Sequence, residues 1–95
     1  MPILHTVNKS PFLTTTLESC LRLAQPGSTI LLIEDGVYAL LSPLLNEYSN
    51  LSFYALAADV QARGLSDRLP AHIQLVDDQG FVQLTVEHDR VESWS

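Results

Sequence analysis

The feature that most constrains this chain is an uninterrupted run of four apolar residues, Ile30–Leu31–Leu32–Ile33. A strand with one face in water alternates between apolar and polar residues, whereas a parallel strand covered on both faces is apolar throughout. Gly27 and Gly36 lie on either side of the run and favour turns there. The run therefore predicts a buried strand at Thr29–Ile33, and it is far shorter than the roughly 20 apolar residues of a membrane span.

The rest of the chain alternates between short apolar runs and segments with helical spacing. Further strands are expected at Ile3–Val7, Leu51–Leu56, Ile73–Val76 and, at the sheet edge, Val91–Trp94; helices are expected over about 16–25, 37–45, 57–63 and 79–87. Strands that alternate with helices over short connections imply right-handed crossovers. The predicted fold is a single α/β domain over residues 1–95: three layers, a mainly parallel sheet of four to five strands, and helices on both faces, flavodoxin-like in broad topology.

Residues with strong end preferences mark where these helices begin and stop. Thr15 lies three residues before Glu18, which is the spacing of a capping box. Pro43 is expected to end or kink the second helix, because proline lacks the amide that a helix interior needs. Asp77 or Asp78 is expected to cap the last helix.

The charge balance excludes several kinds of partner. Five Lys and Arg stand against eleven Asp and Glu, a formal net charge of −6. That balance argues against direct nucleic-acid binding and against docking on an anionic membrane, so any RNA is expected to be met through a partner. The start, MPILHTVNKSPF, lacks the features of a signal peptide, and the expected location is cytoplasmic.

Four carboxylates are expected at the carboxyl ends of two strands, where ligands collect in open parallel sheets. Glu34 and Asp35 follow the second strand, and Asp77 and Asp78 follow the fourth. Carboxylate oxygens suit Mg²⁺, but helix capping explains these positions equally well. An independent Mg²⁺- or small-molecule-binding domain therefore stays open as one interpretation, whereas the absence of a glycine-rich loop after the first strand disfavours nucleotide binding.

Cys20 is the single cysteine, so neither an internal disulfide nor a multi-cysteine zinc site is possible. Leu17, Leu21 and Ala24 lie at helical spacing from it, which predicts that the thiol packs on the buried side of the first helix. Packing and a persulfide-carrying or redox role both remain open for Cys20, the one candidate catalytic residue.

The three histidines are isolated in the sequence, at His5, His72 and His88. His5 is flanked by apolar residues and is expected to make a hydrogen bond in the core. Three scattered histidines and one cysteine form no recognisable metal or catalytic pattern, and we expect neither a metal nor a cofactor. A small sheet with a short edge strand and a Trp94 that could be exposed suggests a component of a larger assembly.

Short motifs along most of the chain resemble those of the TusB/DsrH family of sulfur-relay subunits, which belongs with the DsrE/F/H-like proteins. The motifs are Leu4–His5–Thr6, Ser10–Pro11–Phe12, Leu31–Leu32, Glu34–Asp35–Gly36–Val37, Tyr54–Ala55–Leu56, Ala62–Arg63–Gly64–Leu65, Phe81–Val82–Gln83–Leu84–Thr85 and Trp94. The resemblance implies a heterohexamer with two copies of each of three related subunits, in which a TusD/DsrE-like subunit carries the persulfide-forming cysteine beside a TusC/DsrF-like subunit. It also implies a TusA-like donor, a TusE/DsrC-like acceptor and, in the Tus branch, 2-thiolation of the tRNA wobble uridine.

Two positions bear on the role within such a complex. Ala57–Ala58 follow the third strand, where the persulfide-forming subunit would place its cysteine, and this difference implies a structural or interaction role. Cys20 in the first helix matches DsrH-type members, so the alternative is the DsrH subunit of the complex used in dissimilatory sulfur oxidation, with Cys20 as an auxiliary sulfur-handling thiol.

Overall fold

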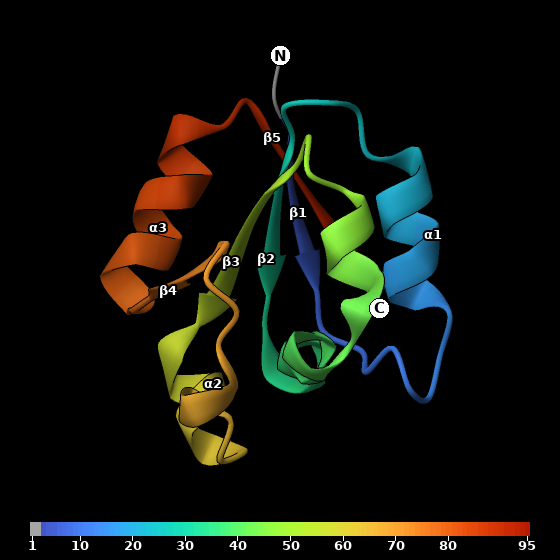
Figure 1. Cartoon of the computed structure of the whole chain (residues 1–95). Coiled ribbons are helices and arrows are strands. Elements are labelled where there is room, and N and C mark those ends of the chain that lie inside the picture. Colours follow the sequence, from blue (N-terminus) through green and yellow to red (C-terminus); the bar gives the residue numbers. More distant parts are fainter. Residues whose placement is uncertain (1–2) are drawn as a thin grey trace.

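A computed structural model describes residues 3–95 and contains one five-stranded sheet in the order β4-β3-β2-β1-β5, with every neighbouring pair parallel (Figure 1). The strands are β1 Ile3–Val7, β2 Thr29–Leu32, β3 Ser52–Leu56, β4 Ile73–Val76 and β5 Arg90–Trp94. The α-helices are α1 Thr16–Leu23, α2 Ala57–Ala62 and α3 Asp78–Glu87, and the 3₁₀ helices are η1 Glu34–Leu41, η2 Pro43–Glu47 and η3 Ser66–Arg68. The predicted three-layer, parallel α/β fold is confirmed. Within the described residues, no helix has both the length and the apolar character needed to cross a membrane.

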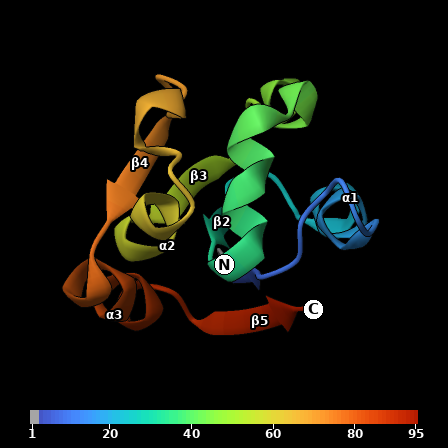
Figure 2. The ribbon, with the colours of Figure 1, turned by 90° about the horizontal axis from the view of Figure 1, so that it is seen from below.

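The direction of each crossover decides which face its helix covers. From β1 to β4 the chain steps along the sheet in one direction, and right-handed crossovers then place α1, η1 and α2 on the same face. The connection from β4 to β5 returns across the whole sheet, which puts α3 on the opposite face (Figure 2). Strand order thus reverses once, at β1, which has β2 on one side and β5 on the other.

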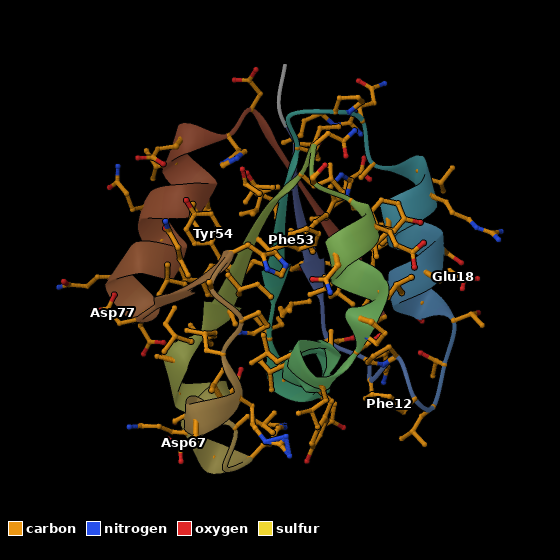
Figure 3. The ribbon with its side chains drawn as sticks, viewed as in Figure 1. Phe12, Glu18, Phe53, Tyr54, Asp67 and Asp77 are labelled. Atoms are coloured by element: carbon orange, nitrogen blue, oxygen red, sulfur yellow. The ribbon has the colours of Figure 1, made fainter. Side chains whose placement is uncertain are left out.

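Two clusters of buried side chains fill the spaces between these layers. The larger one lies under α1, η1 and α2 and includes Ile30, Leu32 and Phe53; the smaller one lies under α3 and includes Leu31 and Leu84. β2 contributes to both clusters and is buried at all four of its positions, as its apolar sequence predicts. Adjacent residues of β3 point to opposite faces, with Phe53 in the larger cluster and Tyr54 packed on the α3 side (Figure 3).

The segment after β2 differs from the helix expected over Val37–Leu45. It forms two 3₁₀ helices separated at Ser42, whose hydroxyl accepts a hydrogen bond from the Leu44 amide while Pro43 occupies the first position of η2. Proline suits a first helical position because no hydrogen bond is required of its nitrogen there. The helix does end before Pro43 as expected, since η1 stops at Leu41 and Ser42 is extended, and Pro43 then starts a new helix.

The two helix starts predicted from sequence have different outcomes. Asp77 caps α3 by accepting a hydrogen bond from the Gly80 amide (2.8 Å), as predicted. Thr15 makes no such bond, and the expected capping box is wrong. Its φ of −97° and ψ of 11° are not the extended conformation that turns a cap side chain back toward the helix, and the Thr14 hydroxyl instead accepts from the Thr16 amide (3.4 Å).

Candidate functional site

The carboxyl end of the sheet beside β1 is the place where a ligand site is expected, because the strand order reverses there. Asn8 follows β1 and donates its backbone N–H to the carbonyl of Trp94 at the end of β5 (3.3 Å). The side-chain Oδ1 of Asn8 is buried and has no hydrogen-bond partner among residues 3–95. Gly36 packs so closely against β1 that a Cβ there would collide with the carbonyl oxygen of Val7. Backbone contacts thus bring η1 and the end of β5 close to the end of β1.

A charged network occupies the neighbouring edge, after β2. Glu34 adopts a left-handed conformation (φ 49°), and its N–H donates to Asp59 Oδ2 on α2 (2.7 Å). Arg63, the residue that ends α2, donates through Nε to Asp35 Oδ1 (3.0 Å), and its Nη2 lies 2.9 Å from the same oxygen. Asp59 lies 3.7 Å from Arg63 as well. The guanidinium also lies over the ring of Tyr38, 6.0 Å from its centroid.

This network gives Asp35 and Asp59 a partner within the chain. Glu34 and Asp35 were predicted at this edge from their place after the strand, whereas Asp59 and Arg63 were not, although an Asp and an Arg four residues apart along a predicted helix indicate an ion pair. Arg63 is 22% exposed, so water screens the pairs only in part. The arrangement fixes the loop after β2 against the start of α2.

The other predicted carboxylates lie elsewhere. Asp77 and Asp78 follow β4 at the outer edge of the sheet, and β3 separates that strand from β2 (Figure 3). Asp77 is engaged as the cap of α3. Over residues 3–95, no three His, Cys, Asp or Glu side chains come together in a way that could hold a metal ion. The geometry therefore gives no support to the Mg²⁺ interpretation.

Cys20 lies on the inner side of α1, where its side chain is fully buried together with Leu17 and Leu21. The predicted packing of the thiol is confirmed. Burial raises the pKa of the Cys20 thiol to about 12, and the carboxylate of Glu92 adds to this shift. The thiolate is the nucleophile in sulfur chemistry, so at neutral pH this cysteine is held in its unreactive form.

The position after β3 is occupied by Ala57 and Ala58 at the beginning of α2. These residues lie at the carboxyl end of a central strand, where a reactive side chain would be placed well. Neither methyl group can act as a nucleophile, and no thiol from another segment replaces them, because Cys20, the single cysteine, is buried on the inner side of α1.

The three histidines make separate contacts, as the sequence predicts. His5 is 3% exposed, and its Nδ1 accepts a hydrogen bond from the indole Nε1–H of Trp94 (3.0 Å). His88 bridges the Leu84 carbonyl and the Thr29 hydroxyl, at 2.7 and 2.9 Å.

Two shallow depressions of about 250 and 190 Å³ adjoin exposed His72, far from the carboxyl end of the sheet.

The hydrogen bond from Trp94 to His5 confirms the core hydrogen bond predicted for His5. Trp94 itself is half-buried against the larger cluster, which corrects the expectation that it could be exposed.

The turn between β1 and α1 carries an exposed apolar pair. Phe12 is 61% and Leu13 83% exposed. Buried Ser10 organises this turn, because its carbonyl accepts from the amides of Leu13 and Thr14 and its hydroxyl accepts from the amide of Phe12. With the bond from the Thr14 hydroxyl to the Ser10 carbonyl, four hydrogen bonds hold the backbone of the turn that carries the two apolar side chains.

Comparison with known proteins identifies the family. The model of the DsrH-like protein family matches residues 9–91. The protein TusB of Pectobacterium parmentieri is 34% identical over 96 aligned positions, and that of Escherichia coli K12 is 38% identical; each alignment covers 97% of this chain and all of the relative. This chain belongs to the TusB/DsrH family.

The fold of this TusB/DsrH protein also has a solved counterpart. The crystal structure of the YchN protein from Escherichia coli superimposes with a TM-score of 0.79 over 98% of both chains, at 19% sequence identity. Identity this low supports the fold alone. Family membership makes the chain a sulfur-relay subunit, and the features above then describe one whose own thiol is sequestered.

Proposed function

We propose that this chain is a structural and interaction subunit of a heterohexameric sulfur-relay complex that supports 2-thiolation of the tRNA wobble uridine. The observation that supports the proposal most strongly is that the chain presents no reactive thiol. Its single thiol, Cys20, is fully buried with its pKa raised to about 12, and Ala57–Ala58 occupy the place after β3 where a persulfide cysteine would stand. A subunit built in this way contributes surfaces and not a nucleophile.

In this proposal the chain assembles with a TusC/DsrF-like and a TusD/DsrE-like subunit, two copies of each, and the TusD/DsrE-like subunit carries the reactive cysteine. Sulfur enters from a TusA-like donor and leaves to a TusE/DsrC-like acceptor by thiolate attack on a sulfane sulfur. The net charge of −6 is unfavourable for contact with tRNA, so the tRNA binds to a later member of the cytoplasmic relay.

The turn that carries Phe12 and Leu13 is the surface that we expect a neighbouring subunit to cover. The cores of protein interfaces are enriched in aromatic residues, phenylalanine among them. Phe12 is such a residue, and the Ser10-centred hydrogen bonds fix the backbone that carries it. A partner subunit would exclude water from its ring.

Affinity purification of the tagged full-length chain from its native host, followed by native mass spectrometry, tests the proposal. We expect a complex with two copies of each of three subunits, and a partner with a cysteine after its third strand. The double variant Phe12→Ser/Leu13→Ser should recover less of the partners, whereas Leu23→Ser, at a site 70% exposed on α1, serves as the matched control. Repeated recovery of a lone monomer at low salt would overturn the proposal.

A second candidate function is the corresponding subunit of a dissimilatory sulfur-oxidation complex. It is favoured by Cys20 in the first helix, a feature of DsrH-type members. In that role the thiol would have to leave its buried position before it could handle sulfur. Identification of the co-purified acceptor, by its association with tRNA thiolation or with sulfite-forming enzymes, separates the two candidates.

A further inference from the structure

The C-terminal strand is attached to the sheet by a contact that depends on the protonation of one histidine. His5 on β1 lies opposite Glu92 in the β5 register, and Trp94 lies two residues further along on the same side. The indole N–H of Trp94 donates to His5 Nδ1 at 3.0 Å, and the two rings are tilted with centroids 6.1 Å apart. These residues are almost as far apart in the sequence as the chain allows.

The hydrogen bond defines the state of the imidazole. Tryptophan has an N–H donor and no acceptor, so His5 Nδ1 must be unprotonated, and the neutral ring carries its hydrogen on Nε2. His5 Nε2 is itself buried without a partner. A second proton would have to be placed on Nδ1, where it would face the indole N–H, and two donors cannot bond to each other.

The same nitrogen has a second neighbour that suits the protonated ring. Glu92 Oε2 lies 3.8 Å from His5 Nδ1, and its other oxygen accepts from Arg90 at 2.9 Å. A neutral His5 therefore selects Trp94, while a protonated His5 selects the Glu92 carboxylate. Because both alternatives belong to β5, the exchange changes how the last strand is held.

The remaining elements around His5 contribute little competing charge. β2 presents Ile30 beside it, and α1, which packs on β1 and β5, presents Cys20, whose thiol stays neutral below a pKa of about 12. Glu18 and Arg22 are exposed residues of α1 and lie 3.8 Å from each other. Burial lowers the pKa of His5 from its usual 6.5, and Glu92 opposes that shift with a smaller effect.

We propose that His5 and Trp94 form a pH-sensitive latch, which fixes the Trp94 end of β5 to β1 at neutral pH and frees the indole when the protonated ring of His5 pairs with Glu92 instead. Among residues 3–95, β5 lies at the edge of the sheet and pairs with β1 alone. Besides the strand pairing, its side chains reach β1 through the Trp94–His5 bond, the Glu92–His5 pair and the bond from the Thr6 hydroxyl to Ser93 (3.3 Å). Without the first, the Trp94 end of β5 keeps the bond from the Asn8 N–H to the Trp94 carbonyl (3.3 Å) and the packing of the indole on the larger cluster.

Trp94 is the single tryptophan, so its fluorescence reports on the latch directly. In the wild-type chain we expect one reversible change in Trp94 emission, a red shift with quenching, whose midpoint lies below pH 6.5. His5→Gln should keep an acceptor for the indole N–H and lose the transition. His72→Gln, which removes an exposed histidine, is the matched control and should retain it.

Two further measurements decide the outcome if His5→Gln does not fold. Glu92→Gln removes the carboxylate that favours the protonated ring, so the midpoint should move to lower pH. Hydrogen exchange of the wild-type chain, corrected for the intrinsic effect of pH, should show the Asn8 amide, which donates to the Trp94 carbonyl, losing protection across the transition while residues 29–32 keep theirs. Emission that titrates identically in His5→Gln, an unmoved midpoint in Glu92→Gln, or unchanged protection of the Asn8 amide would each overturn the latch.

Discussion

β2 and β5 both run parallel to β1, one on each side, and each pairs with it along most of its length. β2 is buried at every position and contributes to the core on both faces of the sheet. β5 has no fully buried residue, and Val91 remains 46% exposed. The same strand can thus be bordered by one neighbour that is part of the core and another that is attached at its surface.

The difference separates two sources of stability. Apolar burial involves no titratable group, so the attachment of β2 is nearly independent of pH. β5 is held by strand pairing together with a hydrogen bond to a titratable ring and charged pairs, and these side-chain contacts depend on protonation and on screening. Structural changes that depend on pH or salt are therefore expected in β5 and not in β2.

The largest effect is expected in β2. Leu31→Ala removes a fully buried side chain from the smaller cluster and should lower the free energy of unfolding by about 2–5 kcal/mol, measured by urea denaturation. Val91→Ala is the matched change in β5 and should lower it by less than about 1 kcal/mol, because nearly half of that side chain already contacts water. Equal losses in the two variants would contradict the comparison.

A second effect concerns the packing of the loop after β2 on β1. Gly36→Ala places a Cβ against the carbonyl oxygen of Val7, and either β1 or η1 must move. We expect a loss of about 3 kcal/mol in chemical denaturation. Gly27→Ala, where a Cβ meets nothing and only the positive φ of 87° opposes the change, should lose about 1 kcal/mol. An unchanged denaturation midpoint for Gly36→Ala would show that this contact is loose.

The β5 attachment should respond to pH as well as to mutation. Trp94→Phe leaves His5 Nδ1 buried without a partner, which should cost about 1–2 kcal/mol at pH 7.5. Because the pKa of His5 is lowered on folding, the unfolded chain binds the proton first, and stability of the wild-type chain should fall as pH drops from above 6.5 toward the folded-state pKa. Thermal denaturation across this range should show a weaker fall in Trp94→Phe; a fall of equal size would contradict the proposed conflict between two donors.

The smallest effect is expected at the surface of β5. Arg90 is 68% exposed, and its ion pair with Glu92 at 2.9 Å is open to water. Arg90→Ala should change the free energy of unfolding by no more than about 0.5 kcal/mol, and that change should vanish in molar salt. A loss above 1 kcal/mol would indicate that this pair belongs to the attachment of the strand.

The elements that sequence predicted best depend on local pattern. The bounds of β4 match the expected Ile73–Val76, and α3 starts after the Asp77 cap as its sequence indicates. Gly64 has a φ of 68° just after α2, where the amide of Leu65 bonds back to the carbonyl of Val60, and this form of helix end is readable from a glycine alone. Burial of Cys20 followed in the same way from the spacing of its helical neighbours.

The features that sequence did not predict depend on contacts between distant segments. The link from Arg63 to Asp35 joins α2 to the loop after β2, and the bond from Trp94 to His5 joins the two ends of the chain. The missing cap at Thr15 has a similar cause, because the Ser10-centred turn fixes the backbone before α1 begins. Periodicity and capping rules describe neighbours along the chain and carry no information about such pairings.

We propose that this subunit supports a sulfur relay without carrying sulfur on its own thiol. The level of 2-thiouridine in tRNA from the native host, after deletion of the gene and complementation with the wild-type or the Cys20→Ala chain, tests this most directly. We expect deletion to abolish the modification and both chains to restore it equally. Failure of folded Cys20→Ala to restore the modification, or normal 2-thiouridine in the deletion strain, would contradict it.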